Sequence, residues 1–283
     1  MRLTMDVEIR PLKTTQEFLE CERLQRRVWA MPDDRDVIPM HLLLSAQRNG
    51  ALVLGAFGKG SLIGLLFGYV GLTSSGRLKH CSHLMGISPE VQGRGVGYRL
   101  KLAQREFALA QGCDLVTWTY DPLESRNANL NIRKLGAVCR TYFEDYYGPM
   151  EDGLNRGLPS DRFQVDWWIA SDRVSERLAG RLGVHLTPED EGLLAAEAQR
   201  AVGRAPGQVS ACRGGDRVWV EIPAAYQAVR ASEPVLAGAW RAETRRVFEE
   251  RFSWGFSVTD FAYRQGRAFY LLTKEEGDAH RPG

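Results

Sequence analysis

The chain has 283 residues, enough for two average domains, and 44% of them are hydrophobic while 25% are charged, as in a globular protein with a sizeable core. The formal net charge is +2 and basic residues are scattered, which gives no support for nucleic acid as a partner. The five cysteines include no C-x-x-C pair, which excludes a zinc site or disulfide framework of the usual spacing and favours a reducing compartment. The first residues form no apolar signal region, and the longest apolar run, Leu62–Leu72, is too short and too glycine-rich to span a bilayer. We therefore expect a cytoplasmic protein with neither a metal nor a membrane as partner.

The N-terminal part predicts a strand, two helices and a hairpin. Thr14 or Thr15 can cap the first helix, and Gly58-Lys-Gly60 forms the turn of the hairpin. A charged loop, Asp33–Asp36, joins the two helices. In chain order, the expected elements cover residues 6–11, 18–29, 39–47, 51–57 and 62–72.

The most informative stretch joins a strand to a helix. The apolar run His80–Ile87 predicts a buried strand, which Pro89 ends because proline cannot donate to a sheet ladder. After Gln92-Gly-Arg-Gly-Val-Gly97 a helical pattern begins at Val96, and Gly112 closes it as a C-terminal cap. The alternating glycines leave the backbone bare where the helix begins. Free N–H groups at the positive end of a helix dipole suit a phosphate or pyrophosphate.

This loop resembles the Q/R-x-x-G-x-G/A motif of the GNAT N-acyltransferases, which hold the pyrophosphate of acyl-coenzyme A. It is not the dinucleotide G-x-G-x-x-G fingerprint, because the third glycine comes one residue early. The resemblance implies acetyl-CoA, or another acyl-CoA, as co-substrate and no metal. It also implies that a backbone N–H near Met85 holds the thioester carbonyl and that the strand pairs with the pantetheine arm through Ile87. The loop residues that it implies as cofactor contacts are Gln92, Gly93, Arg94, Gly95, Val96, Gly97 and Tyr98.

The order of the elements also resembles the GNAT core. Strands are expected over 115–120, 139–147 and 163–169, with a capped helix over 125–137 that ends at Gly136. The implied fold class is α/β (α+β), with a mixed central sheet flanked by helices. Ser125 stands where the family usually has Asn, and Ile132 where it often has the Tyr that protonates the leaving thiolate. These departures leave Asn127 and Asn131 as substitute polar groups facing the cofactor.

The stretches Trp118–Leu123 and Gly157–Phe163 resemble an uncharacterised GNAT subgroup of predicted acetyltransferases. We predict an acyl-CoA-binding catalytic domain over residues 1–170 and a smaller α+β region over 171–283. This second region is a degenerate half-repeat, a sheet extension, or an appendage that caps the active site or forms a homodimer contact. Its expected helices and strands cover residues 176–182, 187–201, 209–211, 218–222, 234–252, 256–263 and 267–272.

Three residues are candidates for proton transfer. His83 lies on the strand before the loop, and a histidine titrates near neutral pH, so it is the candidate base; the alternative is a buried histidine that backbone groups satisfy. Tyr120 and Tyr142 are candidate acids, although each has an alternative role in packing and water can carry either proton. Asp121 either binds the ammonium group of the acceptor or caps the turn at Pro122.

The predicted function is transfer of an acyl group, acetyl by default, from acyl-CoA to the primary amine of a small molecule by direct attack in a ternary complex. One alternative is an N-succinyltransferase that acts on amino acids. Another is a non-catalytic, regulatory module that binds acyl-CoA. The acceptor, the acyl group and the oligomeric state are left open by the sequence.

Overall fold

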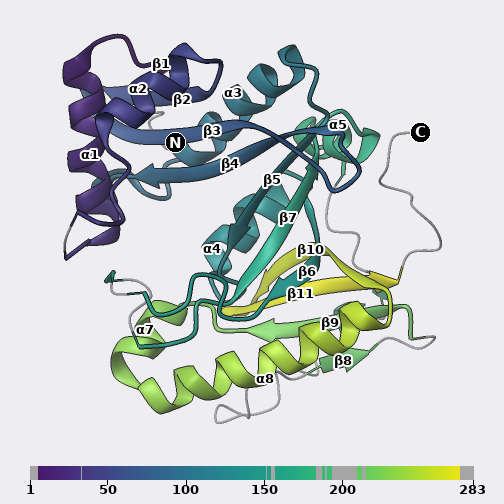
Figure 1. The fold of residues 1–283 in the computed structure, drawn as a ribbon. Coiled ribbons are helices and arrows are strands. Elements are labelled where there is room, and N and C mark those ends of the chain that lie inside the picture. Colours follow the sequence, from purple (N-terminus) through teal and green to yellow (C-terminus); the bar gives the residue numbers. More distant parts are fainter. Residues whose placement is uncertain are drawn as a thin grey trace. The chain divides into compact units, whose positions relative to one another are not determined.

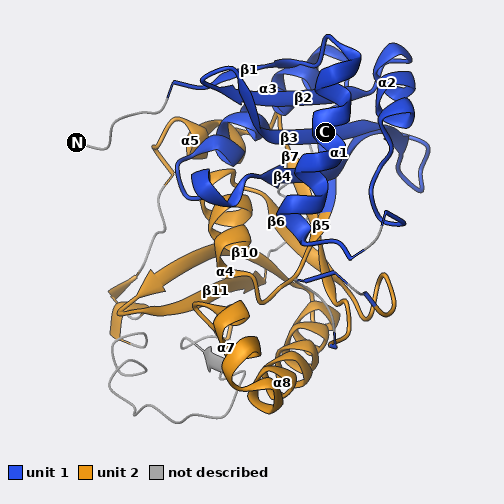
Figure 2. Cartoon of the chain, turned by 90° about the vertical axis from the view of Figure 1, so that its left-hand side faces the viewer, with its two compact units in different colours: residues 1–118, 150–157 blue, residues 119–149, 158–283 orange. Residues whose placement is uncertain are grey.

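A computed structural model describes residues 6–32, 34–150, 152–153, 157–182, 187–188, 190–192, 209–211 and 215–274. The chain forms two compact units, with residues 1–118 and 150–157 in unit 1 and residues 119–149 and 158–283 in unit 2 (Figure 2). The boundary falls inside strand β5 (Leu115–Tyr120), after Trp118. The two units are defined by compactness, whereas the predicted division at residue 170 follows the extent of the GNAT resemblance and stays a prediction.

Unit 1 contains a mixed sheet with the strand order β1-β2-β3-β4-β5 (Figure 1). Neighbouring strands are antiparallel except β4 and β5, which are parallel. Besides β5, its strands are β1 (Glu8–Pro11), β2 (Leu52–Gly58), β3 (Ser61–Leu72) and β4 (Leu78–Ile87). Its helices are α1 (Thr15–Trp29), α2 (Met40–Arg48), the 3-10 turn η1 (Pro89–Val91) and α3 (Val96–Ala110).

Two hydrophobic clusters lie on the two faces of this sheet. Alternate residues of a strand point to opposite faces, and in β2 Val53 belongs to one cluster while Leu52 and Leu54 belong to the other. The Val53 cluster includes residues of α1 and α2, and the other cluster includes Val96 and Leu100 of α3. Helices α1 and α2 therefore cover one face and α3 covers the other.

Local signals explain the ends of the first elements. Thr14 is the N-cap of α1, because its hydroxyl accepts a hydrogen bond from the Glu17 amide at 3.2 Å. The hairpin between β2 and β3 turns through Lys59 and Gly60, which have φ angles of 50° and 79°. Two positive φ angles in a two-residue turn match the twist of the flanking strands. The predicted cap and the predicted hairpin are confirmed.

Unit 2 contains an antiparallel set of strands in the order β7-β6-β10-β11-β9-β8. Its strands are β6 (Val138–Phe143), β7 (Arg162–Trp168), β8 (Val209–Ala211), β9 (Arg217–Ile222), β10 (Phe256–Arg264) and β11 (Arg267–Lys274). Its helices are α4 (Ser125–Ala128), the π-helix η2 (Asn129–Lys134), α5 (Asp172–Leu178), α7 (Tyr226–Ser232) and α8 (Pro234–Ser253). Because Val258 of β10 pairs with Cys139 of β6, the C-terminal strands extend the sheet that holds β6 and β7.

Several expected elements of unit 2 differ in detail. The single helix expected over 125–137 is α4 followed by η2, because the Leu135 amide donates to the Leu130 carbonyl five residues back at 3.0 Å. Strand β6 ends at Phe143, before the left-handed residue Asp145 with a φ of 42°. Helix α5 begins earlier than expected because Ser171 caps it, and α7 was not predicted. Most of the helix expected over 187–201 lies outside the described residues.

Candidate functional site

Two glycines of the Gln92–Gly97 loop have a backbone conformation that other residues rarely adopt. Gly93 and Gly95 have φ angles of 75° and 85°, in the left-handed region that favours glycine. Gly95 is the N-cap of α3 and offers no side chain to cap it. The first N–H groups of the helix, on Val96, Gly97 and Tyr98, precede the first i→i−4 bond and have no acceptor within the helix. Among the described residues, this helix end therefore presents N–H donors without a backbone acceptor, together with a partial positive charge.

The two polar side chains of the loop behave differently. The Gln92 side chain folds back, and its Nε2 donates to the carbonyl of Ile87 at 3.1 Å. This bond ties the loop to the last residue of β4. The Arg94 side chain is exposed, while its amide donates to the Val91 carbonyl at 3.4 Å. Gln92 therefore stabilises the turn, and Arg94 leaves a cationic side chain beside the helix end.

Strand β4 leaves β5 before it reaches the loop. The two strands pair at His80 with Val116 and at Cys81 with Thr117, whereas β4 continues to Ile87. Met85 and Ile87 stay paired with β3, opposite Leu66 and Gly64. A strand paired on one side only offers N–H and C=O groups to another extended chain. The second edge of β4 is thus the kind of surface that the predicted pairing with the pantetheine arm requires.

His83 is the extra residue of a β-bulge in β4. Phe67 pairs with Leu84 and Gly68 pairs with Ser82, so His83 has no partner across the ladder. Its imidazole lies against the rings of Phe67 and Tyr69, with centroid distances of 5.8 and 6.2 Å. This packing desolvates the imidazole in part and lowers its pKa, although much of the side chain is accessible. His83 is therefore exposed, and the alternative of a buried histidine does not describe its geometry.

Helix α1 contacts the end of β4, which the sequence did not suggest. A Cβ at Gly86 would lie 2.8 Å from the Trp29 ring, so the helix approaches the strand closely. The Arg27 guanidinium donates to the buried Ser88 hydroxyl at 3.0 Å, and that hydroxyl bonds the carboxylate of Glu90. The hydrogen bond from Ser88, with backbone bonding and the Arg27 charge, lowers the pKa of Glu90. These contacts fix the chain at the point where it enters the loop.

The candidate acids Tyr120 and Tyr142 belong to unit 2, where both side chains pack against Phe163. The Tyr120 and Tyr270 hydroxyls are 3.0 Å apart, and the Tyr142 hydroxyl donates to Asp161 at 2.5 Å. Burial raises the pKa of both candidates. A tyrosine whose pKa is raised is a weaker acid than a free one, so these contacts favour packing over proton donation.

The segment with the departures from the GNAT pattern is also in unit 2. Asn127 is exposed and Asn131 is buried, so the two amides have different surroundings. The Ser125 hydroxyl donates to the carbonyl of Ala224 at 2.7 Å and accepts from the Tyr263 hydroxyl at 3.0 Å. Ile132 is fully buried. The position where the family often has Tyr is thus part of the hydrophobic core.

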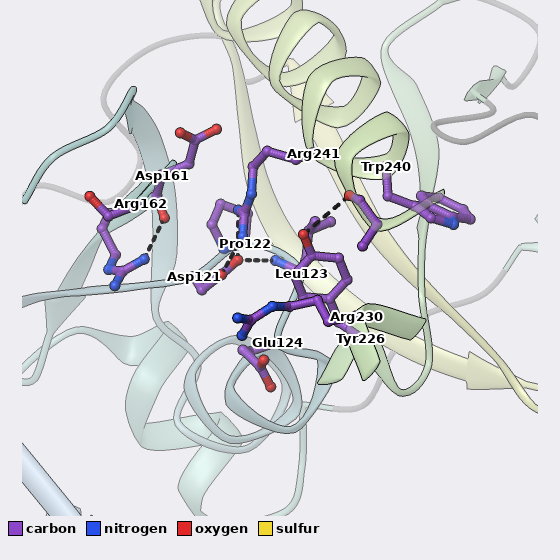
Figure 3. A network of polar contacts seen from close by, with 12 residues as sticks. Asp121, Pro122, Leu123, Glu124, Asp161, Arg162, Tyr226, Arg230, Trp240 and Arg241 are labelled. Atoms are coloured by element: carbon purple, nitrogen blue, oxygen red, sulfur yellow. Dashed lines mark hydrogen bonds and ion pairs between the residues drawn. The ribbon is translucent and has the colours of Figure 1, made fainter. Parts of the chain in front are cut away.

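Asp121 is occupied by contacts within unit 2 (Figure 3). One carboxylate oxygen accepts from the Leu123 amide at 2.9 Å and from Arg241 Nη1 at 2.8 Å. The other oxygen accepts from Arg241 Nη2. Both oxygens are therefore used by the turn that follows β5 and by helix α8, which favours the capping interpretation of Asp121 over an ammonium site.

No cluster of three or more His, Cys, Asp or Glu side chains among the described residues has an arrangement that could hold a metal ion. No helix among the same residues is long and apolar enough to cross a membrane.

Comparison with solved structures finds acetyltransferases. The chain is similar to a GNAT-family acetyltransferase from Streptococcus pneumoniae, with 18% identity over 57% of this chain and 98% of that chain and a TM-score of 0.45. It is similar to the ribosomal-protein-S18-alanine N-acetyltransferase of Escherichia coli, with 15% identity over 64% of this chain and 99% of that chain and a TM-score of 0.46. It is also similar to a chain of the NatC complex bound to Gag peptide and CoA, with 16% identity, coverage of 57% and 98%, and a TM-score of 0.46.

No family model and no curated protein matches the sequence. The solved structures to which the chain is similar thus include GNAT-family acetyltransferases, the family whose motif the Gln92–Gly97 loop resembles. Because the identities are below 25% and the TM-scores below 0.5, the proposed activity rests on the residues of this chain.

Proposed function

We propose that this chain is an N-acyltransferase that moves an acyl group, acetyl by default, from acyl-CoA to the primary amine of a small molecule. The observation that carries the proposal is the junction of β4 and α3. Within the part of the chain that the structure describes, a strand edge without a partner leads directly into a glycine loop, and the N–H groups at the start of the following helix have no acceptor. The first feature suits the amide-bearing pantetheine arm, and the second suits a pyrophosphate.

The chemistry that we propose is direct attack without a covalent enzyme intermediate. The neutral amine attacks the thioester carbon, a C–N bond forms, and the C–S bond breaks to release the thiolate of CoA. A backbone N–H near Met85 stabilises the negative charge on the carbonyl oxygen. His83 accepts the proton of the amine, and water returns a proton to the thiolate. The lowered pKa of His83 supports this role, because the imidazole is then neutral at working pH.

One observation favours a second candidate, a non-catalytic module that binds acyl-CoA. The position where the family often has its acid is the buried Ile132, and the hydroxyls of Tyr120 and Tyr142 contact partners within unit 2. If a side-chain acid is essential for turnover, this chain has none at that position. Binding would then survive without transfer.

The test follows CoA binding and thiol release together. Binding of CoA is measured by calorimetry, and thiol release from acetyl-CoA and succinyl-CoA is followed over small amines, amino acids and a peptide with a free N-terminus. Thiol release with a small amine supports the proposal, and preference for succinyl-CoA with amino acids supports the succinyltransferase alternative. Release only with the peptide would overturn the small-molecule acceptor. CoA binding without any release would overturn the enzyme.

A further inference from the structure

A lysine is buried beneath the sheet of unit 1. Lys101 of α3 is 1% exposed, and its Nζ donates to the Ser82 hydroxyl at 2.8 Å and to Gln104 Oε1 at 3.1 Å. The same Nζ lies 3.6 Å from the centroid of the Trp118 ring. These contacts join α3 to β4 through Ser82 and to β5 through Trp118. Nothing in the proposed chemistry uses this side chain.

The position of these contacts along the two strands is specific. The last residues that pair β4 with β5 are Cys81 and Thr117. Ser82 and Trp118 are the next residue on each strand. Lys101 therefore contacts both strands at the first position after their pairing ends, which we call the fork. Beyond the fork, β4 carries the unpaired edge from His83 to Ile87.

The surroundings of Lys101 make its burial costly. No carboxylate bonds Lys101 among the residues that the structure describes, and burial lowers its pKa well below the ordinary value. Ser82 and Gln104 each supply one acceptor to the Lys101 amino group, and the Trp118 ring faces it. A methionine would fill a similar volume without this polar cost. Packing alone thus gives no reason for a lysine here.

The next residues around the fork are buried and closely packed. His80 is fully buried, and neither of its ring nitrogens has a hydrogen-bond partner within the described residues. Burial, with a smaller contribution from Lys101, lowers the pKa of His80 to about 4. A Cβ at Gly68 would lie 2.4 Å from His80 Nε2, so there is no room for a larger side chain. The cluster is therefore closely packed, and its burial disfavours charge.

We propose that Lys101 is a positioning residue that holds β4 and β5 at a fixed separation at the fork. Through Ser82 it fixes the backbone of the adjoining β4 edge, which offers its N–H and C=O groups to the pantetheine arm. This role rests on the proposed function, because it concerns the binding of the acyl donor. It differs from a role in catalysis, since Lys101 is too buried to touch a substrate.

The test replaces Lys101 with methionine and uses Lys59→Met, in the exposed turn between β2 and β3, as the matched control. We expect Lys101→Met to stay folded with a urea midpoint near that of the wild type, because the lower cost of burying methionine is offset by the hydrogen bonds that Ser82 and Gln104 lose. We expect its Kd for CoA and its KM for acyl-CoA to rise about tenfold, or ~1.4 kcal/mol, with kcat and the KM for the amine little changed. Lys59→Met should match the wild type in every measurement.

A wild-type Kd for CoA in a stable Lys101→Met protein would overturn the proposal, and so would a fall in kcat with an unchanged Kd. If Lys101→Met does not fold, Ser82→Ala decides the question by the same measurements, because it removes one contact and keeps the lysine. In the double variant, Ser82→Ala should add nothing to Lys101→Met if both act through one contact.

A readout that needs no ligand separates this proposal from the proposed function. Hydrogen exchange of the amides from His83 to Ile87 should be faster in Lys101→Met than in the wild type or Lys59→Met. If the wild type binds no CoA, the proposed function fails, while faster exchange still supports the role at the fork. If exchange of these amides is unchanged, Lys101 does not fix the strand.

Discussion

Arg241 of helix α8 forms a bidentate ion pair with Asp121, the residue that follows β5, and their side chains are only 4% and 12% exposed. Burial by itself lowers the pKa of Arg241, but the charge and hydrogen bonds of Asp121 outweigh it and raise the pKa overall. One turn later, Arg245 donates from Nε and Nη2 to the two oxygens of Asp161, each at 2.9 Å. Two arginines of one helix thus anchor two carboxylates that come from distant parts of the sequence.

Replacement of Asp121 by asparagine should destabilise unit 2 strongly. The variant keeps the shape of the side chain but leaves the buried Arg241 without a countercharge, and breaking a buried pair in this way costs about 3–5 kcal/mol. Urea unfolding measures the loss. The control is Glu243→Gln on the same helix, which removes the exposed pair with Arg246 and should cost less than ~1 kcal/mol. Equal losses of unfolding free energy in the two variants would show that the buried pair with Asp121 stabilises unit 2 no more than an exposed pair does.

Gly97→Glu should abolish CoA binding while the fold survives. Gly97 lies in the first turn of α3, and a glutamate there places bulk and negative charge where we propose that the pyrophosphate binds. Gly97 is a better target than Gly95, whose φ of 85° would strain any other residue. Calorimetry with CoA gives the result, and Gly97→Ala, which adds no charge, is the control. Normal CoA binding by Gly97→Glu would mean that the loop is not the donor site.

The rate should depend on pH through His83. A general base acts in its neutral form, so kcat/KM falls as the pH drops through the pKa of the base. Because that pKa is lowered from 6.5, we expect the acid limb of the profile below pH 6.5. Tyr69→Thr removes one of the two rings that desolvate the imidazole, so the pKa of His83 should rise and the acid limb should move to higher pH. His83→Gln should lower kcat by ~10²–10⁴, and a loss well under tenfold would exclude His83 as the base.

Glu17 should stabilise unit 1 at neutral pH but not at strongly acidic pH. Its carboxylate accepts from Arg10 at 2.8 Å and from the Lys13 amide at 2.6 Å, and the Arg10 hydrogen bond is the main cause that lowers its pKa from 4.5 to about 2. A lowered acid pKa contributes stability above the unfolded pKa, and this is lost as the pH falls through the folded one. Glu17→Gln should therefore cost ~1 kcal/mol at pH 7, and the loss should shrink as the pH falls from 4.5 and vanish only below the folded pKa of about 2, as urea unfolding at several pH values would show. A constant difference at all pH values would contradict the linkage.

Much of the secondary structure was predictable because its signals are local. Thr14 caps α1, Gly58-Lys-Gly60 turns the hairpin, and the strands on either side fall within a residue or two of their predicted bounds. The predictions were wrong where a local pattern had more than one solution. Residues 125–137 have a helical pattern, but a pattern of side chains does not distinguish the α-helix from the π-helix over Asn129–Lys134.

The same distinction applies to the candidate site. The proposed donor loop was predictable because its glycines and the start of the helix are neighbours in sequence. The β-bulge at His83, the Ser88 contact with Arg27 and the fork at Lys101 depend on partners in other elements. A lysine in the helical pattern after the loop gives no sign that it is buried, since its spacing would equally suit an exposed face.

The sequence by itself determined the flexible backbone at Gly93 and Gly95 and the bare start of α3, because backbone freedom and a missing cap are properties of the residues in place. Only the tertiary structure decided the roles of the charged side chains. Asp121 finds its partner Arg241 120 residues later, and Lys101 is held between strands that separate beside it. The pairing and the burial of a charged side chain depend on which surfaces meet. Packing between elements decides this, rather than any one stretch of the chain.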